Sequence, residues 1–234
     1  MLNYFFICKS IKFLTFLHLK GFILVIYQSQ LYAILIIMAP DLSTLVFATN
    51  NHHKLEEIRK ITKDSILIRS LNECGFNREI EETKDSLEGN ATLKAETVYK
   101  ETGLPCFADD TGLFVSALDG APGVFSARFA GEDAKDTDNV SLLLQKLEGT
   151  KDRSAYFKTV ISLVTQEEQY LFSGVIHGTI TERPIGDNGF GYDPVFVPNG
   201  YDKTFAQLDS KIKNTISHRA KATAALISFL NQSK

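Results

Sequence analysis

The feature that most limits how this chain can fold is a strand, a helix and a second strand in close succession. Residues 45–49 (LVFAT) are a short apolar run that two asparagines end. Residues 53–61 carry leucine and isoleucine at helical spacing, with lysine and glutamate between them. Residues 66–68 are apolar again. This β–α–β opening is typical of an α/β fold.

The rest of the chain continues to alternate between the two patterns. Asp85 to Glu88 resemble a helix capping signal, so we expect a helix over residues 86–101. The apolar residues 106–108 predict a strand that ends at Asp109-Asp110-Thr111-Gly112. The remaining expected elements are a strand at 113–118, Gly-rich loops at 120–131 and 185–191, a helix at 136–147, a β-hairpin formed by 155–164 and 169–181, a strand at 195–197 and a helix at 217–231. One mixed α/β domain fits this order better than two.

Residues 1–37 form a basic, apolar leader unlike the rest of the chain. The first 38 residues hold three lysines and no acid, so the remainder has 28 acidic and 22 basic residues, a net charge of -6. The apolar stretches 22–27 and 31–37 are interrupted by Gln-Ser-Gln, which makes a marginal membrane span, and no small-x-small cleavage site follows for secretion. We favour a third interpretation, in which the working domain is 38–234 and begins at Met38.

Charge and cysteine content argue against several classes of partner and site. An acidic domain lacks the basic surface that a nucleic-acid polymer requires. The three cysteines are odd in number and show no C-x-x-C spacing. This argues against a disulfide framework or a zinc site and suits a reducing cytoplasm. No membrane partner is expected unless the leader is real.

The first polar constellation follows the first strand. It consists of Thr49, Asn50, Asn51, His52, His53 and Lys54. A strand that runs into a helix N-terminus presents free N–H groups and the positive end of the helix dipole, which suits a phosphate. A solvated loop with a surface lysine is the alternative. Adjacent histidines on a helix point apart, so we expect exposed histidines rather than a metal site.

The second constellation combines acids with a helix face. Glu81 and Glu82 precede the helix, and Asn90 and Lys94 lie four residues apart on it, so they share a face. A carboxylate and a lysine that converge on one cleft suit Mg²⁺ and a phosphate, respectively. An ordinary charged helix face is the alternative, and the choice between Glu81 and Glu82 as the metal ligand stays open.

The third constellation is the pair Asp109-Asp110 with Thr111. Ligands of α/β sheets bind at strand ends, and successive strand residues alternate in direction, so only one of the two carboxylates need face the site. Such a carboxylate can hold Mg²⁺ or take a proton from an attacking water. An Asp-rich turn is the alternative.

The last two constellations lie in the C-terminal third. In Phe190, Gly191, Tyr192 and Asp193, an aromatic ring can stack on a base and a carboxylate can accept from a base N–H. In Lys213, Ser217, His218 and Arg219, Ser217 can cap the last helix, and the histidine and arginine can donate to a carbonyl oxygen. The alternatives are a core aromatic beside a turn and a basic helix start.

Taken in this order, the five segments resemble the inosine triphosphate pyrophosphatase family, the pyrophosphatases of non-canonical purine nucleoside triphosphates. The matching stretches are LVFATNNHHKLEEI, EIEETKDSLEGNATLKA, PCFADDTGLFVSALDGAPGVFSARFAG, FGYDPVFVP and KNTISHRAKA, which together span residues 45–221. The resemblance implies an elongated central mixed sheet flanked by helices, with two lobes and the active-site cleft between them. It also implies a homodimer.

The resemblance further implies Mg²⁺-dependent hydrolysis of ITP, dITP and XTP between the α and β phosphates, giving the monophosphate and pyrophosphate. By position, Glu82 and Asp110 would hold Mg²⁺ and Asp110 would be the general base. The triphosphate would contact Thr49 to Lys54, Lys94 and Thr111, and the base and its neighbouring phosphate would contact Phe190 to Asp193, Lys213, His218 and Arg219. Donors at His218 and Arg219 suit a 6-oxo group and disfavour the 6-amino group of ATP.

Two departures from the family pattern and two other functions need weighing. Asn50 replaces the usual glycine, and because asparagine tolerates a left-handed backbone we expect the turn to persist. Thr111 replaces a serine and keeps the hydroxyl. A phosphatase with an aspartate nucleophile would need its D-x-D at the end of the first strand, where this chain has none. A nucleotide sensor that binds without hydrolysis is disfavoured because Asp110, Glu82 and Lys94 are all present.

Overall fold

In the computed structural model, the chain divides into two compact units, Met1–Asp41 and Leu42–Lys234. In the first unit the structure describes the backbone of residues 14–19, 22–27 and 33–37; in the second it describes residues 42–62, 65–166 and 168–232.

The strands described in the first unit form a small antiparallel sheet. β1 (Leu14–Leu19) pairs with β2 (Phe22–Tyr27), and β2 pairs with β3 (Ala33–Ile37). The apolar stretch that we considered as a marginal span is therefore extended at 22–27 and 33–37, and residues 28–32 lie outside the described part. None of the helices in the described residues is long and apolar enough to cross a membrane.

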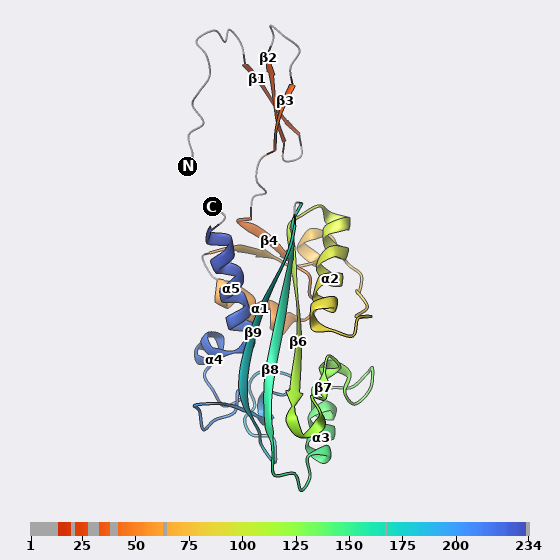
Figure 1. Ribbon diagram of the computed structural model, residues 1–234, viewed down its shortest axis with the longest axis vertical. Coiled ribbons are helices and arrows are strands. Elements are labelled where there is room, and N and C mark those ends of the chain that lie inside the picture. Colours follow the sequence, from red (N-terminus) through yellow and green to blue (C-terminus); the bar gives the residue numbers. More distant parts are fainter. Residues whose placement is uncertain are drawn as a thin grey trace. The chain divides into compact units, whose positions relative to one another are not determined.

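The second unit is built on a mixed sheet (Figure 1). Its strands are β4 (Thr44–Phe47), β5 (Leu67–Arg69), β6 (Cys106–Val115), β7 (Pro122–Gly123), β8 (Ser154–Val164), β9 (Gln169–Ile180) and β10 (Phe196–Pro198). The order is β10-β9-β8-β6-β4-β5, with β7 paired to β6. β4 is parallel to both β5 and β6, whereas the pairs β6–β8, β8–β9 and β9–β10 are antiparallel. The βαβ opening and the long hairpin are thus confirmed.

Five α-helices accompany the sheet in the described residues. They are α1 (His52–Thr62), α2 (Leu87–Thr102), α3 (Asp136–Lys146), α4 (Ser210–Ile216) and α5 (His218–Gln232). α2 begins after Ser86, whose side chain accepts from the Gly89 N–H, so Ser86 rather than Asp85 is the cap. The sequence did not predict α4. Ser217 separates it from α5 and, as expected, accepts an N–H of the last helix, that of Ala220, at 3.1 Å.

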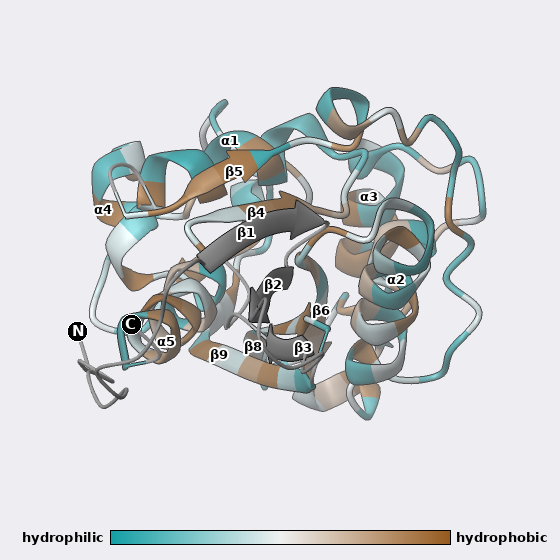
Figure 2. Cartoon of the chain, turned by 90° about the horizontal axis from the view of Figure 1, so that it is seen from above, coloured by the Kyte–Doolittle hydropathy of each residue, from teal (hydrophilic) through white to brown (hydrophobic). Residues whose placement is uncertain are grey.

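Side chains that alternate along β4 divide the core around this strand into two layers. Leu45 and Phe47 point to one face of β4, where they pack with α5, and Val46 and Ala48 point to the other, where they pack with α2. α5 and α2 therefore cover opposite faces of the sheet, and hydrophobic residues of both helices turn towards it (Figure 2). A third cluster, which includes Val115, Leu143 and Phe196, fills the other end of the unit.

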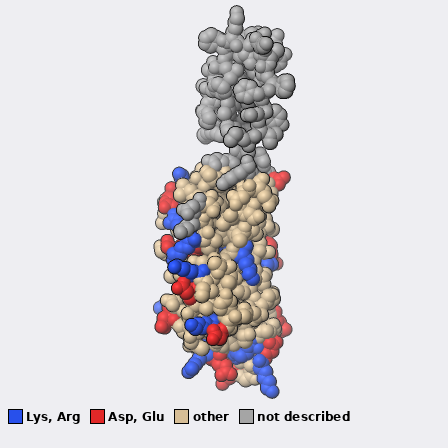
Figure 3. All heavy atoms as spheres, turned by 90° about the vertical axis from the view of Figure 1, so that its left-hand side faces the viewer, with Lys and Arg blue, Asp and Glu red and all other residues tan. Residues whose placement is uncertain are grey.

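The surface of the second unit carries both signs of charge. On the face shown in Figure 3, Lys and Arg are interspersed with Asp and Glu. Such a face has no extended region of a single sign, unlike the basic surface that phosphate-backbone binding needs.

Candidate active site

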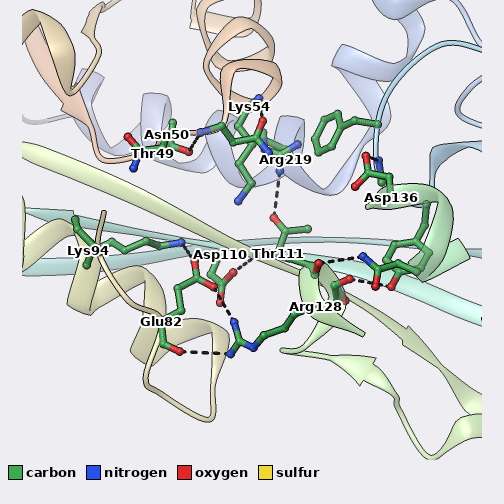
Figure 4. Close-up of a pocket in the computed structure, with 18 of the residues that line it drawn as sticks. Thr49, Asn50, Lys54, Glu82, Lys94, Asp110, Thr111, Arg128, Asp136 and Arg219 are labelled. Atoms are coloured by element: carbon green, nitrogen blue, oxygen red, sulfur yellow. Dashed lines mark hydrogen bonds and ion pairs between the residues drawn. The ribbon is translucent and has the colours of Figure 1, made fainter. Parts of the chain in front are cut away.

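A cleft of about 740 Å³ opens where β4 ends and the longer β6 continues beside it. Its lining includes every site residue expected from the sequence except His52 and His53. Those lining residues are Thr49, Asn50, Asn51, Lys54, Glu82, Lys94, Asp110, Thr111, Phe190, Gly191, Tyr192, Asp193, Lys213, His218 and Arg219. Figure 4 shows one wall carrying Thr49, Asn50, Lys54 and Arg219 and the facing wall carrying Lys94, Glu82, Asp110 and Arg128.

The two aspartates lie within a strand, not at its end as we expected. β6 runs without a break from Cys106 to Val115 because β8 pairs with it over its whole length. β4, by contrast, pairs with β6 only at Cys106 and Phe107. Beyond that point the side of β6 that β4 leaves free borders the cleft, which gives the Asp-Asp-Thr run access to a ligand although it lies in mid-strand.

Alternation along β6 sends Asp109 and Thr111 to one side. The buried Asp109 carboxylate accepts from Lys54 Nζ at 2.9 Å and from Arg219 Nε at 3.0 Å. Burial disfavours its charge, but Lys54, Arg219 and Lys94 outweigh burial and hold the pKa of Asp109 well below its usual range. The Thr111 hydroxyl shares a 2.7 Å hydrogen bond with that of Thr159 on β8. Asp109 therefore anchors cations from two helices.

Asp110 points to the opposite side, toward α2. It accepts from Asn90 Nδ2 at 3.2 Å. Burial raises the pKa of Asp110 to about 6, with Lys94 opposing the shift and the like charge of Glu82 adding to it. A buried carboxylate that titrates near neutral pH suits a general base.

Lys94 joins this group from α2. Its ammonium donates to Glu82 and, at 2.8 Å, to the backbone carbonyl of Asp109. Although burial disfavours the charge, Asp110, Glu82 and Asp109 together raise the pKa of Lys94 above its ordinary value. Glu81 also lines the cleft, but its side chain is exposed. The expectation that Asn90 and Lys94 share a face is confirmed.

The other end of the cleft holds a buried ionic network. Lys213 Nζ lies 2.6 Å from Asp193 and 2.7 Å from Glu57, and Arg219 Nη1 lies 2.5 Å from Glu57. Burial raises the pKa of Asp193 despite the nearby Lys213. Sequence reasoning missed Glu57, which lies on α1 one turn after Lys54. Its only sequence signal was this helical spacing from a candidate site residue.

His218 is buried beside this network, in surroundings that favour its neutral form. Burial, Arg219 and Lys213 lower its pKa well below the ordinary value. Its ring stacks on Phe157 with centroids 4.5 Å apart, and Nδ1 has no hydrogen-bond partner in the described residues. A buried polar atom without a partner is costly, so this nitrogen is a ready contact for a ligand.

The loop after β4 caps α1 with its own side chains. The Asn51 amide oxygen accepts from the Lys54 N–H at 3.1 Å, and the Thr49 hydroxyl accepts from the Asn51 N–H at 3.1 Å. In the described residues the only positive φ outside glycine is that of Asp119, so Asn50 does not adopt the left-handed backbone that we had invoked to explain the turn. His52 and His53 are exposed as expected, and His53 stacks on Phe190 at 5.4 Å.

The oxygen donors of the cleft fit a magnesium ion. The described residues contain no group of three or more histidine, cysteine or acidic side chains that could hold a metal alone. Mg²⁺, however, is commonly held by one or two carboxylates together with substrate phosphates. Glu82 and Asp110 supply two hard oxygen ligands whose mutual repulsion a cation would relieve.

The fold is that of a mixed α/β protein, and the lysines and the helix N-terminus that border its cleft suit a polyanionic ligand. The chain belongs to the Ham1 family, whose model matches residues 45–229.

Known proteins of this family resemble the chain closely. A dITP/XTP pyrophosphatase of Flavobacterium johnsoniae is 53% identical over 190 residues, which cover 81% of this chain and 99% of that protein. One from Porphyromonas gingivalis is 53% identical over 187 residues, covering 80% and 96%. The solved Ham1 protein of Staphylococcus aureus matches with a TM-score of 0.74 and 41% identity over 82% of this chain and 100% of that one. The nucleoside-triphosphatase / dITP/XTP pyrophosphatase of Mycobacterium abscessus matches with a TM-score of 0.64 and 41% identity over 78% and 98%.

Proposed function

We propose that this chain is a dITP/XTP pyrophosphatase, which hydrolyses non-canonical purine nucleoside triphosphates, ITP included, to the monophosphate and pyrophosphate. The observation that carries the proposal is the group formed by Asp110, Glu82 and Lys94 on one wall of the cleft. The identity of about 50% to relatives that bear this name supports it.

In the proposed reaction, the phosphates lie between the two walls of the cleft, which belong to two lobes. Lys54 and Lys94 offset the charge of the phosphates, and the N-terminus of α1 donates N–H groups. Asp110 takes the proton from the attacking water. Glu82 and Asp110 would hold Mg²⁺, which when bound offsets the charge that develops on the leaving phosphates.

The base would lie at the other end of the cleft. Phe190 and Tyr192 would offer ring faces, and Asp193, held by Lys213, would accept a base N–H. His218 and Arg219 would donate to a 6-oxo group. A site that satisfies such a group rejects an amino group in the same place, because two donors would face each other.

The decisive experiment is a product assay. With Mg²⁺, the protein is expected to release pyrophosphate from dITP, XTP and ITP far faster than from ATP. Orthophosphate as the only product would favour an aspartate-nucleophile phosphatase, and tight dITP binding without any product would favour a sensor.

Arg219→Ala is expected to lose the preference for ITP over ATP. An unchanged ratio of the two hydrolysis rates would show that Arg219 does not take part in base recognition.

Two further parts of the proposal concern the molecule in the cell. We propose a cytoplasmic homodimer. The free thiols of Cys74 and Cys106 support a reducing compartment. The dimer rests on the family resemblance, and analytical ultracentrifugation at several protein concentrations tests it.

A further inference from the structure

The cations that line the cleft differ in how firmly acids hold them. Among the described residues they are Lys54, Lys94, Arg128, Lys213 and Arg219. Four of these lie within 3.0 Å of a carboxylate. Arg128 is the exception, because its carboxylate contacts, with Glu82 and Glu132, are both at 3.8 Å. Arg128 is therefore the cation most free to accept a new anionic partner.

Arg128 is nevertheless oriented toward the cleft. It ends the short helix η3 (Ser126–Arg128), and its guanidinium lies 5.2 Å from the Phe125 ring centroid. Nη2 donates to the backbone carbonyl of Glu82 at 3.4 Å, a long and weak bond. Figure 4 shows the side chain reaching toward Glu82 and Asp110 across the wall of the cleft. Since a guanidinium has five N–H donors, several remain for a ligand.

The position of Arg128 indicates which part of the nucleotide it meets. Arg219, at the base end, bonds Asp109 on one side of β6, whereas Asp110 faces Asn90 on the other side. Arg128 contacts Glu82 and so belongs to the side of Asp110. If the attacked phosphorus lies beside Asp110, the phosphates beyond it extend toward Glu82 and Arg128.

We propose that Arg128 binds the two phosphates that leave as pyrophosphate, through the planar N–H fork that matches phosphate oxygens. The proposal rests on the proposed function for the identity of the substrate. It adds a substrate-contacting residue that sequence reasoning did not single out, since Arg128 lies in a stretch expected to be a Gly-rich loop.

The test measures pyrophosphate affinity calorimetrically with the full chain, with Mg²⁺ and again with EDTA. Arg128→Ala is expected to weaken pyrophosphate binding by about 10- to 100-fold in both conditions, because charge-assisted hydrogen bonds are lost. Arg128→Lys, which keeps the charge without the fork, is expected to lose less. The inhibition constant of the nucleoside monophosphate is expected to change by less than about threefold in Arg128→Ala. Added guanidinium ion is expected to restore part of the turnover that Arg128→Ala loses.

Arg78→Ala is the matched control. Like Arg128, Arg78 lies beside a phenylalanine ring, 5.3 Å from the Phe76 centroid, but it is ion-paired with Glu101 at 2.7 Å and does not line the cleft. It is expected to leave pyrophosphate affinity unchanged. If Arg128→Ala does not fold, Arg128→Gln and Arg128→Lys supply the same comparison.

Two results would overturn the proposal. One is equal pyrophosphate affinity in wild type and variants. The other is a loss seen only with Mg²⁺, which would mean that Arg128 acts solely by holding Glu82. Absence of any dITP hydrolysis by the wild type would instead contradict the proposed function, and pyrophosphate binding that depends on Arg128 would still support the phosphate contact.

Discussion

Asp109 and Asp110 are adjacent carboxylates whose charge environments oppose each other. Lys54 and Arg219 keep Asp109 ionised, whereas burial raises the pKa of Asp110 to about 6. Carboxylates whose pKa values are pushed apart take different roles. Asp109 fixes two cations of the cleft in place, and Asp110 is left as the group able to exchange a proton near neutral pH.

Asp110→Asn is expected to lower pyrophosphate release by at least about 10²- to 10⁴-fold, the usual contribution of a general base. Its stability toward urea at pH 7 is expected to stay equal or to rise, since a pKa raised by about two units costs the ionised form up to about 3 kcal/mol. Asp109→Asn is the contrasting variant and is expected to lose about 3 kcal/mol or more, because it breaks buried ion pairs. Full activity of Asp110→Asn would refute the base assignment.

The lowered pKa of His218 leads to a prediction about how the stability of the fold depends on pH. Its pKa in the folded protein lies below that of the unfolded chain, so the unfolded state takes up the proton first as the pH falls. The stability that the neutral ring contributes is complete above about pH 6.5 and is lost below it, at about 1.4 kcal/mol per pH unit. The free energy of unfolding, measured with urea at pH 7.5 and at pH 5.5, is expected to fall more for wild type than for His218→Gln when the pH is lowered.

The loss of stability is compared between wild type and His218→Gln because Asp110 is present in both. The pKa of Asp110 is raised to about 6, so this group gains a proton in the same pH range and favours the folded state as the pH falls, opposite to the effect of His218. His177→Gln, a change at an exposed histidine of β9, is the control and is expected to keep the wild-type pH dependence. Identical slopes for wild type and His218→Gln would show that His218 is not held neutral.

Among the elements, those with a strong local pattern were predictable. Apolar spacing indicated α1 and α2, and the alternating runs indicated β8 and β9. The Asp-Asp-Thr-Gly run instead suggested a strand end, but β8 supplies backbone partners along all of β6. α4, with seven residues, was missed because it is too short to show a period.

The contact between α5 and β9 has a direct test at Gly174. A Cβ at this position would lie 2.1 Å from the His218 carbonyl oxygen and 2.5 Å from the Ala222 nitrogen. Gly174→Ala must therefore displace α5, which begins with His218 and Arg219. We expect a loss of about 2–3 kcal/mol in urea unfolding and a lower kcat/KM for dITP. The exposed neighbour Ser173→Ala is the control, and wild-type values for both variants would contradict this packing.

At the scale of the whole molecule, the acidic domain binds a polyanion by local arrangement of charge. Residues after 38 carry a net charge of -6, yet Lys54, Lys94, Arg128, Lys213 and Arg219 all line one cleft. All of these except Arg128 lie within 3.0 Å of a carboxylate, which holds those four cations at fixed positions in the cleft.

The leader gives a prediction at the same scale. The family match begins at residue 45, and we propose Met38 as the start of the working domain. Protein shortened to begin at Met38 is expected to hydrolyse dITP at the rate of the full chain, and the N-terminal mass of the native protein is expected to correspond to that start. A native mass that includes residues 1–37, together with lost activity on shortening, would contradict this.

The sequence by itself determined the family, the order of most elements and about half of the residues that line the cleft, because these follow from local spacing and from motifs that occur in a fixed order. Only the tertiary structure decided how those residues are paired. Asp109 meets Arg219 across 110 positions and Glu57 meets Lys213 across 156. Such pairs depend on which side of β6 a carboxylate faces and on which helix packs there. Neither is encoded in local periodicity, so only the tertiary structure shows that Glu57 contacts Lys213 and that Arg128 lines the cleft beside Glu82.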